Sequence, residues 1–141
     1  MDTALILKKL EALERCIRRI ESKRPDSAEL LRESLDLQDI LAVNLERAVQ
    51  TCVDVASHIL AESSGKSPET MGECFERLAE AGIVEEPLAT RMQKAVGFRN
   101  IAVHEYEEID WDIVFAIVTR DLEDFRAFAR ATLRHCERAG A

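Results

Sequence analysis

Residues 26–62 read DSAELLRESLDLQDILAVNLERAVQTCVDVASHILAE, and this segment predicts one long amphipathic helix. Asp26-Ser27-Ala28-Glu29 resembles a capping box at its start, and Ser63-Ser64-Gly65 is expected to end it. At 1.5 Å per residue, about 36 residues would extend roughly 54 Å, which suits the central helix of an elongated bundle. The residues predicted to face the core are Leu30, Leu37, Leu41, Ala48, Cys52, Val55 and Ile59.

One helix is expected before this segment and three after it. They are predicted over residues 3–21, ended by Arg24 and Pro25; from Ser67-Pro68-Glu69 to Ala81-Gly82; from Glu86-Pro87 to His104; and from Asp110 onward. Their apolar residues recur at helical spacing, at Ile6, Leu10, Leu13, Ile17, Ile20, Phe75, Leu78, Met92, Val96, Ile101, Val114, Ile117, Leu122, Phe125, Phe128 and Leu133. We therefore expect an all-α fold, an antiparallel up-down bundle of four long helices plus one short helix, in a single domain over residues 1–141.

The composition agrees with a helical domain. The chain has 141 residues, of which 47% are hydrophobic and 33% charged, and it holds only 5 Gly and 3 Pro. These values exclude a collagen-like or disordered chain and disfavour a β-sandwich with many turns. Its uncharged runs are shorter than the ~20 apolar residues of a membrane-spanning helix, and its start lacks a secretory signal. We expect a cytoplasmic protein.

Charge and cysteine usage restrict the chemistry. With 19 basic against 27 acidic residues the formal net charge is −8, so any nucleic-acid role must come from a local group of basic residues. The 4 Cys and 3 His show neither CxxC nor HxxxH spacing. No metal site, cofactor or disulfide framework is predicted, and the cysteines are interpreted as small buried hydrophobic residues.

The segment GFRNIAVHEY, residues 97–106, departs from an ordinary amphipathic helix and holds the only tyrosine of the chain. At ~100° per residue, Asn100 and His104 fall on one side, and Arg99 and Tyr106 fall close together if the helix continues to Tyr106. All four side chains would then share one patch.

This combination suits metal-free cleavage of RNA. Imidazole has an ordinary pKa near 6.5 and can both accept and donate a proton, while guanidinium stabilises the extra negative charge of the transition state. The neighbouring 2′-hydroxyl of RNA is the available nucleophile. Two proton-transfer roles are needed and each chain has one suitable histidine, so a two-fold dimer is expected to supply both.

The same residues carry a family resemblance. Arg99, His104 and Tyr106 match the R-x4-H-x-Y motif of HEPN ribonucleases. The surroundings resemble the HepT-like branch, in the family's order and over roughly residues 35 to 130. The segments that carry this resemblance are Asp54-Val55-Ala56-Ser57-His58-Ile59-Leu60, Phe75-Glu76-Arg77-Leu78, Gly82-Ile83-Val84 and Gly97-Phe98-Arg99-Asn100.

The resemblance implies a ribonuclease toxin of a type VII toxin–antitoxin pair, with tRNA or mRNA as substrate and a composite active site at a homodimer interface. Arg99 and His104 would be catalytic and Asn100 a supporting residue. Tyr106 would be the site where an MntA-like nucleotidyltransferase antitoxin attaches AMP, adding bulk and negative charge that repel an RNA phosphate. Asp54 is a candidate for orienting Arg99 or His104.

Some residues allow two interpretations. Asp54 could instead form a salt bridge to an arginine of a neighbouring helix. Arg126, Arg130, Arg134 and Arg138 recur every four residues. They form either a solvated stripe paired with Glu123 and Glu137, or a surface that follows the RNA backbone or docks an acidic partner.

The carboxylates after His104 are also open to two interpretations. They are Glu105, Glu107, Glu108, Asp110 and Asp112. Asp110 is expected to cap the last helix and Trp111 to be a packing anchor; the acids could instead raise the pKa of His104 or bind a basic partner. The alternative function, favoured by the net acidity and few aromatic residues, is a non-catalytic helical module that docks a nucleotidyltransferase or a nucleotide.

Overall fold

The computed structural model describes residues 2–62 and 67–140, and every regular element in these ranges is helical. The all-α prediction is confirmed. The elements are α1 (Thr3–Lys23), α2 (Ala28–Glu33), α3 (Leu35–Ala61), α4 (Met71–Glu80), α5 (Glu86–His104), the 3-10 turn η1 (Tyr106–Glu108), α6 (Trp111–Ala116), the π-helical segment η2 (Ile117–Asp121) and α7 (Leu122–Gly140).

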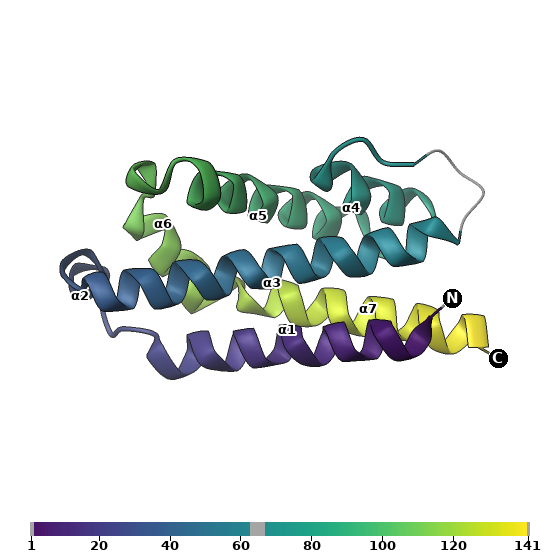
Figure 1. The fold of residues 1–141 in the computed structure, drawn as a ribbon, viewed down its shortest axis with the longest axis horizontal. Helices are drawn as coiled ribbons and strands as arrows, with labels where there is room; N and C mark the ends of the chain where they lie inside the picture. Colours follow the sequence, from purple (N-terminus) through teal and green to yellow (C-terminus); the bar gives the residue numbers. More distant parts are fainter. Residues whose placement is uncertain (1, 63–66, 141) are drawn as a thin grey trace.

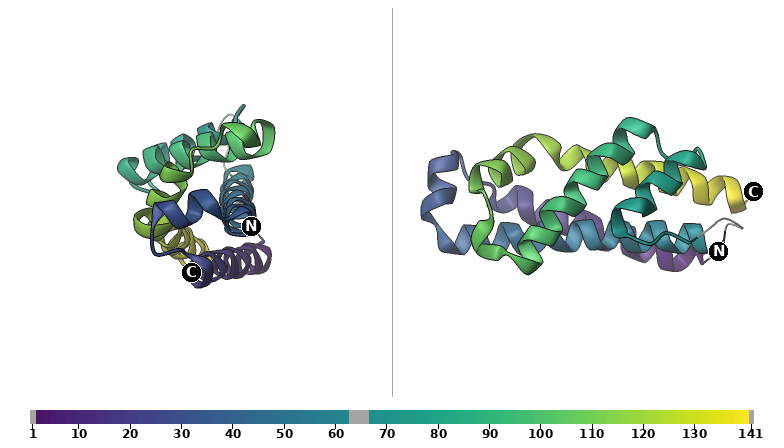
Figure 2. Two further views of the ribbon diagram at one scale, coloured as in Figure 1. Left: turned by 90° about the vertical axis from the view of Figure 1, so that its left-hand side faces the viewer. Right: turned by 90° about the horizontal axis from the view of Figure 1, so that it is seen from above.

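The long helices run alternately in opposite directions along one axis (Figure 1). Helix α3 lies in the middle of that view, with α1 and α7 on one side of it and α4 and α5 on the other. The end-on view in Figure 2 shows α1, α3, α5 and α7 around a common interior. The beginning of α1 and the end of α7 lie at the same end of the molecule.

The predicted long helix over residues 26–62 is wrong in one respect, because Ser34 divides it into α2 and α3. The backbone of Ser34 is extended, with φ −106° and ψ 104°, and its N–H donates to the carbonyls of Leu30 and Leu31. Its side-chain oxygen accepts from the Leu37 N–H at 3.2 Å, so Ser34 is the N-cap of α3. The predicted end at Ser63-Ser64-Gly65 lies outside the described residues.

The break changes which leucine is buried. Leu30, predicted to face the core, is 49% exposed, whereas Leu31 is 0% exposed. Gln38 holds α2 in place, because its side-chain amide donates to the Leu31 and Arg32 carbonyls at 3.0 and 3.1 Å. The helical spacing that selected Leu30 assumed a continuous helix and therefore failed across the break.

The short helix α4 begins later than predicted. Its N-cap is Thr70, whose side-chain oxygen accepts from the Glu73 N–H at 3.1 Å, rather than Ser67. Its predicted end at Ala81-Gly82 is confirmed, and Gly82 has φ +74°, a left-handed conformation that favours glycine. The predicted ends of α5, with a proline in its first turn and His104 as its last residue, are also confirmed.

The last predicted helix is interrupted. Asp110 caps α6 as expected, its carboxylate accepting from the Asp112 N–H at 3.0 Å. The following five residues, Ile117–Asp121, are π-helical before α7 begins. A π segment lacks the regular i→i−4 hydrogen bonds of an α-helix. One carbonyl of this segment, that of Val118, accepts instead from Arg24 in the loop after α1 at 3.0 Å.

The core follows most of the predicted apolar positions, although Ile101 of α5 is 41% exposed and Leu133 of α7 is only half-buried. On α1, the four residues Ile6, Leu13, Ile17 and Ile20 are buried, and Leu10 packs against them partly buried. Phe75 of α4 and Phe128 of α7 meet edge to face, with ring centroids 5.6 Å apart. Cys52, Cys74 and Cys136 are buried free thiols, as expected, and Cys16 is half-buried. Within the described residues, no helix combines the length and hydropathy needed to span a membrane.

Replacing Ser34 with alanine is expected to lower the free energy of unfolding by about 1 kcal/mol, because the first turn of α3 loses its side-chain cap. Urea denaturation followed by circular dichroism measures the change. Ser57→Ala is the matched control, since Ser57 lies on the exposed side of α3 and caps no helix. Equal stability of wild type and Ser34→Ala would contradict the assigned role.

Candidate active site

Three of the predicted site residues lie on the last turns of α5. Arg99 donates from Nη1 to the Asn100 Oδ1 at 3.2 Å. Asn100 and His104 are exposed and four residues apart, so they share one face of the helix, while Ala102 faces the core. Helix α5 thus carries an arginine, an amide and an imidazole on its last two turns.

Most of the hydrogen-bond donors of Arg99 and His104 have no protein partner among the described residues. The Nε of Arg99 is buried and has no hydrogen-bond partner among the described residues. Within residues 2–62 and 67–140, neither Arg99 nor His104 forms an ion pair, and His104 makes no side-chain hydrogen bond. A buried N–H without a partner is costly in a folded protein, so a site that keeps one is suited to receive an anionic acceptor.

Tyr106 does not join this group as predicted, because the helix stops at His104. Glu105 leaves helical geometry, with φ −141° and ψ 52°, and Tyr106 begins η1. The Tyr106 hydroxyl donates to Asp39 Oδ1 of α3 at 2.6 Å. Its ring meets Trp111 edge to face, with centroids 5.9 Å apart. Burial, together with the hydrogen bond and negative charge of Asp39, raises the pKa of Tyr106 to about 12, so the phenol is neutral at pH 7.

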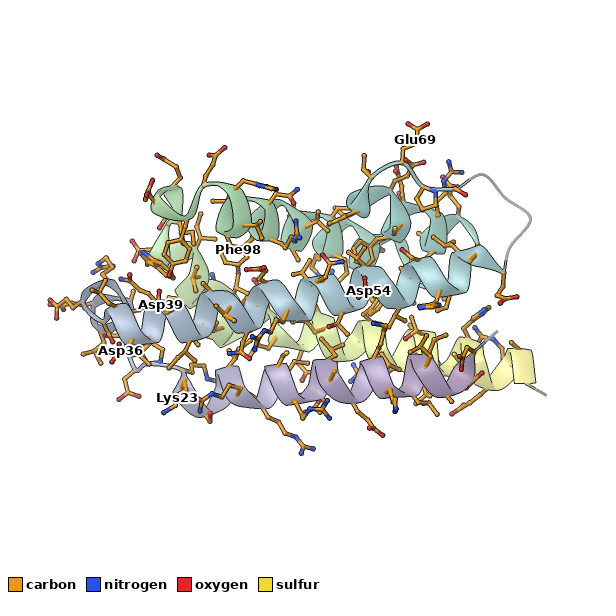
Figure 3. All side chains as sticks on the ribbon, viewed as in Figure 1. Lys23, Asp36, Asp39, Asp54, Glu69 and Phe98 are labelled. Carbon is orange, nitrogen blue, oxygen red and sulfur yellow. The ribbon has the colours of Figure 1, made fainter. Side chains whose placement is uncertain are left out.

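Asp39 is the partner of Tyr106 that sequence reasoning missed. It stands 67 residues from Tyr106 in the chain, near the start of α3, and Figure 3 labels it there. Its spacing from the neighbouring acid Asp36 is that of an ordinary exposed helix turn. Only the packing of α3 beside the end of α5 shows its partner, so no signal in the sequence could have found it.

The predicted orienting role of Asp54 is not supported. Its carboxylate accepts from the Lys9 ammonium of α1 at 3.3 Å and from the Gln50 amide at 3.0 Å. Asp54 follows Asp39 by 15 positions on α3, a separation of roughly 22 Å along the helix axis, and Figure 3 shows the two labels well apart. Asp54 therefore forms a salt bridge with a neighbouring helix, although its partner is a lysine rather than an arginine.

The arginines of α7 separate into two kinds. Arg126 donates to both Glu14 and Glu21 of α1 at 2.9 to 3.0 Å, and we call these three residues the Arg126 cluster. These hydrogen bonds lower the pKa of both glutamates and raise that of Arg126. The prediction that Arg126 contacts RNA is therefore wrong in this arrangement, because its donors already hold α1 against α7.

The remaining arginines of α7 face outward. Arg130 lies 3.8 Å from Glu123 and is exposed, and Arg134 and Arg138 are exposed with no ion pair in the described part of the chain. The exposed stripe of basic residues therefore lacks Arg126, the first of its four predicted members. Arg130, Arg134 and Arg138 keep the spacing of four residues that places them on one face of α7.

The acidic run after His104 forms the predicted capped junction. Besides the cap at Asp110, the Asp112 carboxylate pairs with Arg32 of α2. Trp111 is half-buried and packs against the core, as expected of an anchor. Glu105, Glu107 and Glu108 are exposed.

A cavity of about 600 Å³ lies between α5 and the α6–α7 segment. Its walls are largely apolar and include Phe98, Ile101, Ile113 and Phe125. Arg99, His104 and Tyr106 are not among its lining residues; His104 is exposed and Arg99 is half-buried. In residues 2–62 and 67–140, no three His, Cys, Asp or Glu side chains are grouped to hold a metal ion.

Comparisons with known proteins agree on one family. The family model described as ribonuclease HepT-like matches residues 13–132. An mRNA nuclease HepT from Shewanella oneidensis is 36% identical over 124 residues, covering 88% of this chain and 92% of that protein. A tRNA nuclease HepT from Aphanizomenon flos-aquae is 29% identical over 131 residues, covering 92% and 88%.

A solved structure shows the same similarity in three dimensions. It contains a tri-AMPylated Shewanella oneidensis HEPN toxin in complex with MNT antitoxin. This chain superposes on it with a TM-score of 0.85 and 35% identity, covering 93% of this chain and 97% of that one.

The Arg126 cluster predicts a specific response to acid. Glu14 and Glu21 have folded-state pKa values below their ordinary 4.5, so their stabilisation is complete above pH 4.5 and is lost as the pH falls through the lowered values. Arg126→Met should reduce the free energy of unfolding by about 2 kcal/mol at pH 7, and the difference should shrink toward pH 3. Arg130→Met is the control, because its single ion pair is long and exposed. A difference independent of pH in urea titrations would contradict this assignment.

Proposed function

This chain belongs to the ribonuclease HepT-like family, and from the geometry of α5 we propose that Arg99 and His104 cleave RNA phosphodiesters. The observation that carries the assignment is that the last two turns of α5 hold both the exposed imidazole of His104 and an arginine whose buried Nε has no partner among the described residues. Both groups stand on one rigid helix, so their relative position is set before RNA binds.

His104 and Arg99 would act in complementary ways. His104 removes the proton of the ribose 2′-hydroxyl, which attacks the adjacent phosphorus, and a second imidazole protonates the leaving 5′-oxygen. Arg99 donates to the phosphate oxygens and stabilises their additional negative charge in the transition state. Asn100 supports Arg99 by accepting from its Nη1. The products are a 2′,3′-cyclic phosphate and a 5′-hydroxyl.

The second imidazole comes from a second copy of the chain. Each chain has one histidine on the same helix as Arg99, and this residue, His104, is exposed rather than enclosed. A two-fold axis next to the end of α5 would bring two His104 and two Arg99 around one phosphate. The exposed position of His104 on the single chain supports this homodimer, because a partner surface is needed to exclude water from the reaction.

The partner that restrains this activity would be an MntA-like nucleotidyltransferase antitoxin that attaches AMP to Tyr106. The related Shewanella oneidensis toxin is AMPylated and bound to MNT antitoxin. Tyr106 is two residues from His104 and its side chain is 39% exposed, so it is accessible to an enzyme. A phosphate attached there brings negative charge beside the catalytic pair and opposes RNA binding.

The RNA backbone would be guided by the exposed arginines of α7, Arg130 and Arg134. The net charge of −8 provides no general attraction, so local cations must supply it. Arg126 has no part in this, since its donors are committed to Glu14 and Glu21.

Arg99→Ala and His104→Ala should each lower the rate of RNA cleavage at least about 10²-fold, because each removes one essential group. Purified chain is incubated with RNA in EDTA, and the cut ends are analysed for 2′,3′-cyclic phosphate. Arg19→Ala and His58→Ala are matched controls, since both residues are exposed and lie on other helices. Full activity in either site variant would contradict its role.

A charge reversal on α7 tests the RNA-guiding surface. Arg130→Glu with Arg134→Glu should reduce the slope of log affinity against log salt concentration by about 1.4 units, about 0.7 for each lost phosphate contact on a single strand, because phosphate contacts release counterions. Arg15→Glu with Arg19→Glu makes the same change in net charge at the same spacing on α1, and should leave the slope nearly unchanged. Identical slopes for the two double variants would reject the surface.

A further inference from the structure

Asp39 accepts a hydrogen bond from the Tyr106 hydroxyl, and the geometry of this bond affects how readily the tyrosine oxygen can lose its proton. The hydroxyl points its proton at Asp39 Oδ1, and the oxygen atoms are 2.6 Å apart, a short hydrogen bond to a charged acceptor. Asp39 makes no other side-chain hydrogen bond or ion pair within the described ranges. Edge contact with Trp111 fixes the ring, so two different elements hold the hydroxyl in one position.

A neutral phenol needs a proton acceptor before it can attack phosphorus efficiently, and this acceptor must be within hydrogen-bond reach of the oxygen. We propose that Asp39 is the proton acceptor for nucleotidyl transfer to Tyr106, so that the toxin itself supplies the base for its own modification. This inference rests on the proposed modification of Tyr106 and goes beyond it by assigning the base to this chain.

The step balances with a nucleoside triphosphate as the donor. The Tyr106 oxygen forms a bond to the α-phosphorus while the bond from that phosphorus to the bridging oxygen breaks, and pyrophosphate leaves with the bonding electron pair. The hydroxyl proton passes to Asp39 Oδ1, which releases it to solvent afterwards. Asp39 is exposed enough to exchange this proton, because it lies on the outer side of α3.

The other acids near Tyr106 do not have this geometry. Glu105, Glu107 and Glu108 neighbour it in sequence, yet none of them accepts a hydrogen bond from its hydroxyl. Asp112 is paired with Arg32. Asp36 is one turn from Asp39 on α3 and accepts no hydrogen bond from the Tyr106 hydroxyl. Asp39 is therefore the carboxylate that the fold aims at the reacting oxygen.

The modification would also break the contact that promoted it. An esterified Tyr106 oxygen carries no proton to donate, and its new phosphodiester charge stands against the Asp39 carboxylate. Two negative charges at such a distance repel each other. The modified side chain therefore leaves Asp39, and the cationic Arg99 is the group of opposite sign on the neighbouring turns of α5.

The test measures AMP transfer to the full chain by its cognate MNT-type nucleotidyltransferase, with radiolabelled MgATP. Asp39→Asn keeps an acceptor oxygen but is a far weaker base, so kcat for AMP transfer should fall about 10²-fold while KM for the toxin stays unchanged. Asp39→Glu restores a carboxylate and should recover much of the wild-type kcat. Asp36→Asn removes the same charge one turn away and should transfer AMP within about twofold of wild type.

RNA cleavage by each unmodified variant shows that it is folded, since Asp39 has no part in the nuclease mechanism. A wild-type kcat in Asp39→Asn, or a loss confined to KM, would overturn the assignment of the base. Absence of AMP transfer to wild-type Tyr106 would overturn this inference together with the proposed modification, while RNA cleavage by the free chain would still support the proposed nuclease.

Discussion

Burial of α3 on more than one side is the constraint on which the rest of the structure depends. Residues such as Leu41, Ala48 and Cys52 have no exposed surface, and the buried positions span a wide arc of the helix. A helix that is apolar over so wide an arc must be covered by several neighbours. Helix α1 covers one side and α4 with α5 another, so this packing sets where α5 lies in the molecule (Figure 1).

The position of the functional residues follows from that packing. Because α5 lies beside α3, the end of α5 meets the beginning of α3, and Tyr106 reaches Asp39 across this corner. Two contacts with α2 stabilise this corner further. Arg32 of α2 pairs with Asp112, and the side-chain amide of Gln38 on α3 donates to the carbonyls of Leu31 and Arg32 near the end of α2. Arg99 and His104, for which we propose the catalytic role, therefore lie on the last turns of α5, and the hydroxyl of Tyr106, two residues further along the chain, is held by Asp39.

An acidic protein can act on RNA only if its few cations are not all consumed by its carboxylates. The arginines of this chain differ in whether they are paired with carboxylates. Arg126 is neutralised by two glutamates and joins two helices, whereas Arg99, Arg134 and Arg138 form no ion pair among the described residues. Electrostatic attraction to RNA depends on such local cations, at the proposed site and along α7, and does not require a positive net charge.

The sequence by itself determined the helical class, the buried face of α1, the bounds of α5 and the place of Arg99, Asn100 and His104 on its last turns, because these depend on spacing within one helix. It also determined the family, through the motif and its helical surroundings. The sequence did not reveal one local feature, the break at Ser34. The Ser34 side chain competes with the helix for backbone hydrogen bonds, and it divides a segment whose apolar spacing is continuous.

Only the tertiary structure decided which distant residues meet. The pairing of Tyr106 with Asp39, of Arg126 with Glu14 and Glu21, and of Asp54 with Lys9 joins residues 45 to 112 positions apart. Helical periodicity relates residues only a few turns apart, so it carries no information about such contacts. They arise when apolar faces pack and bring side chains of different helices within reach of one another.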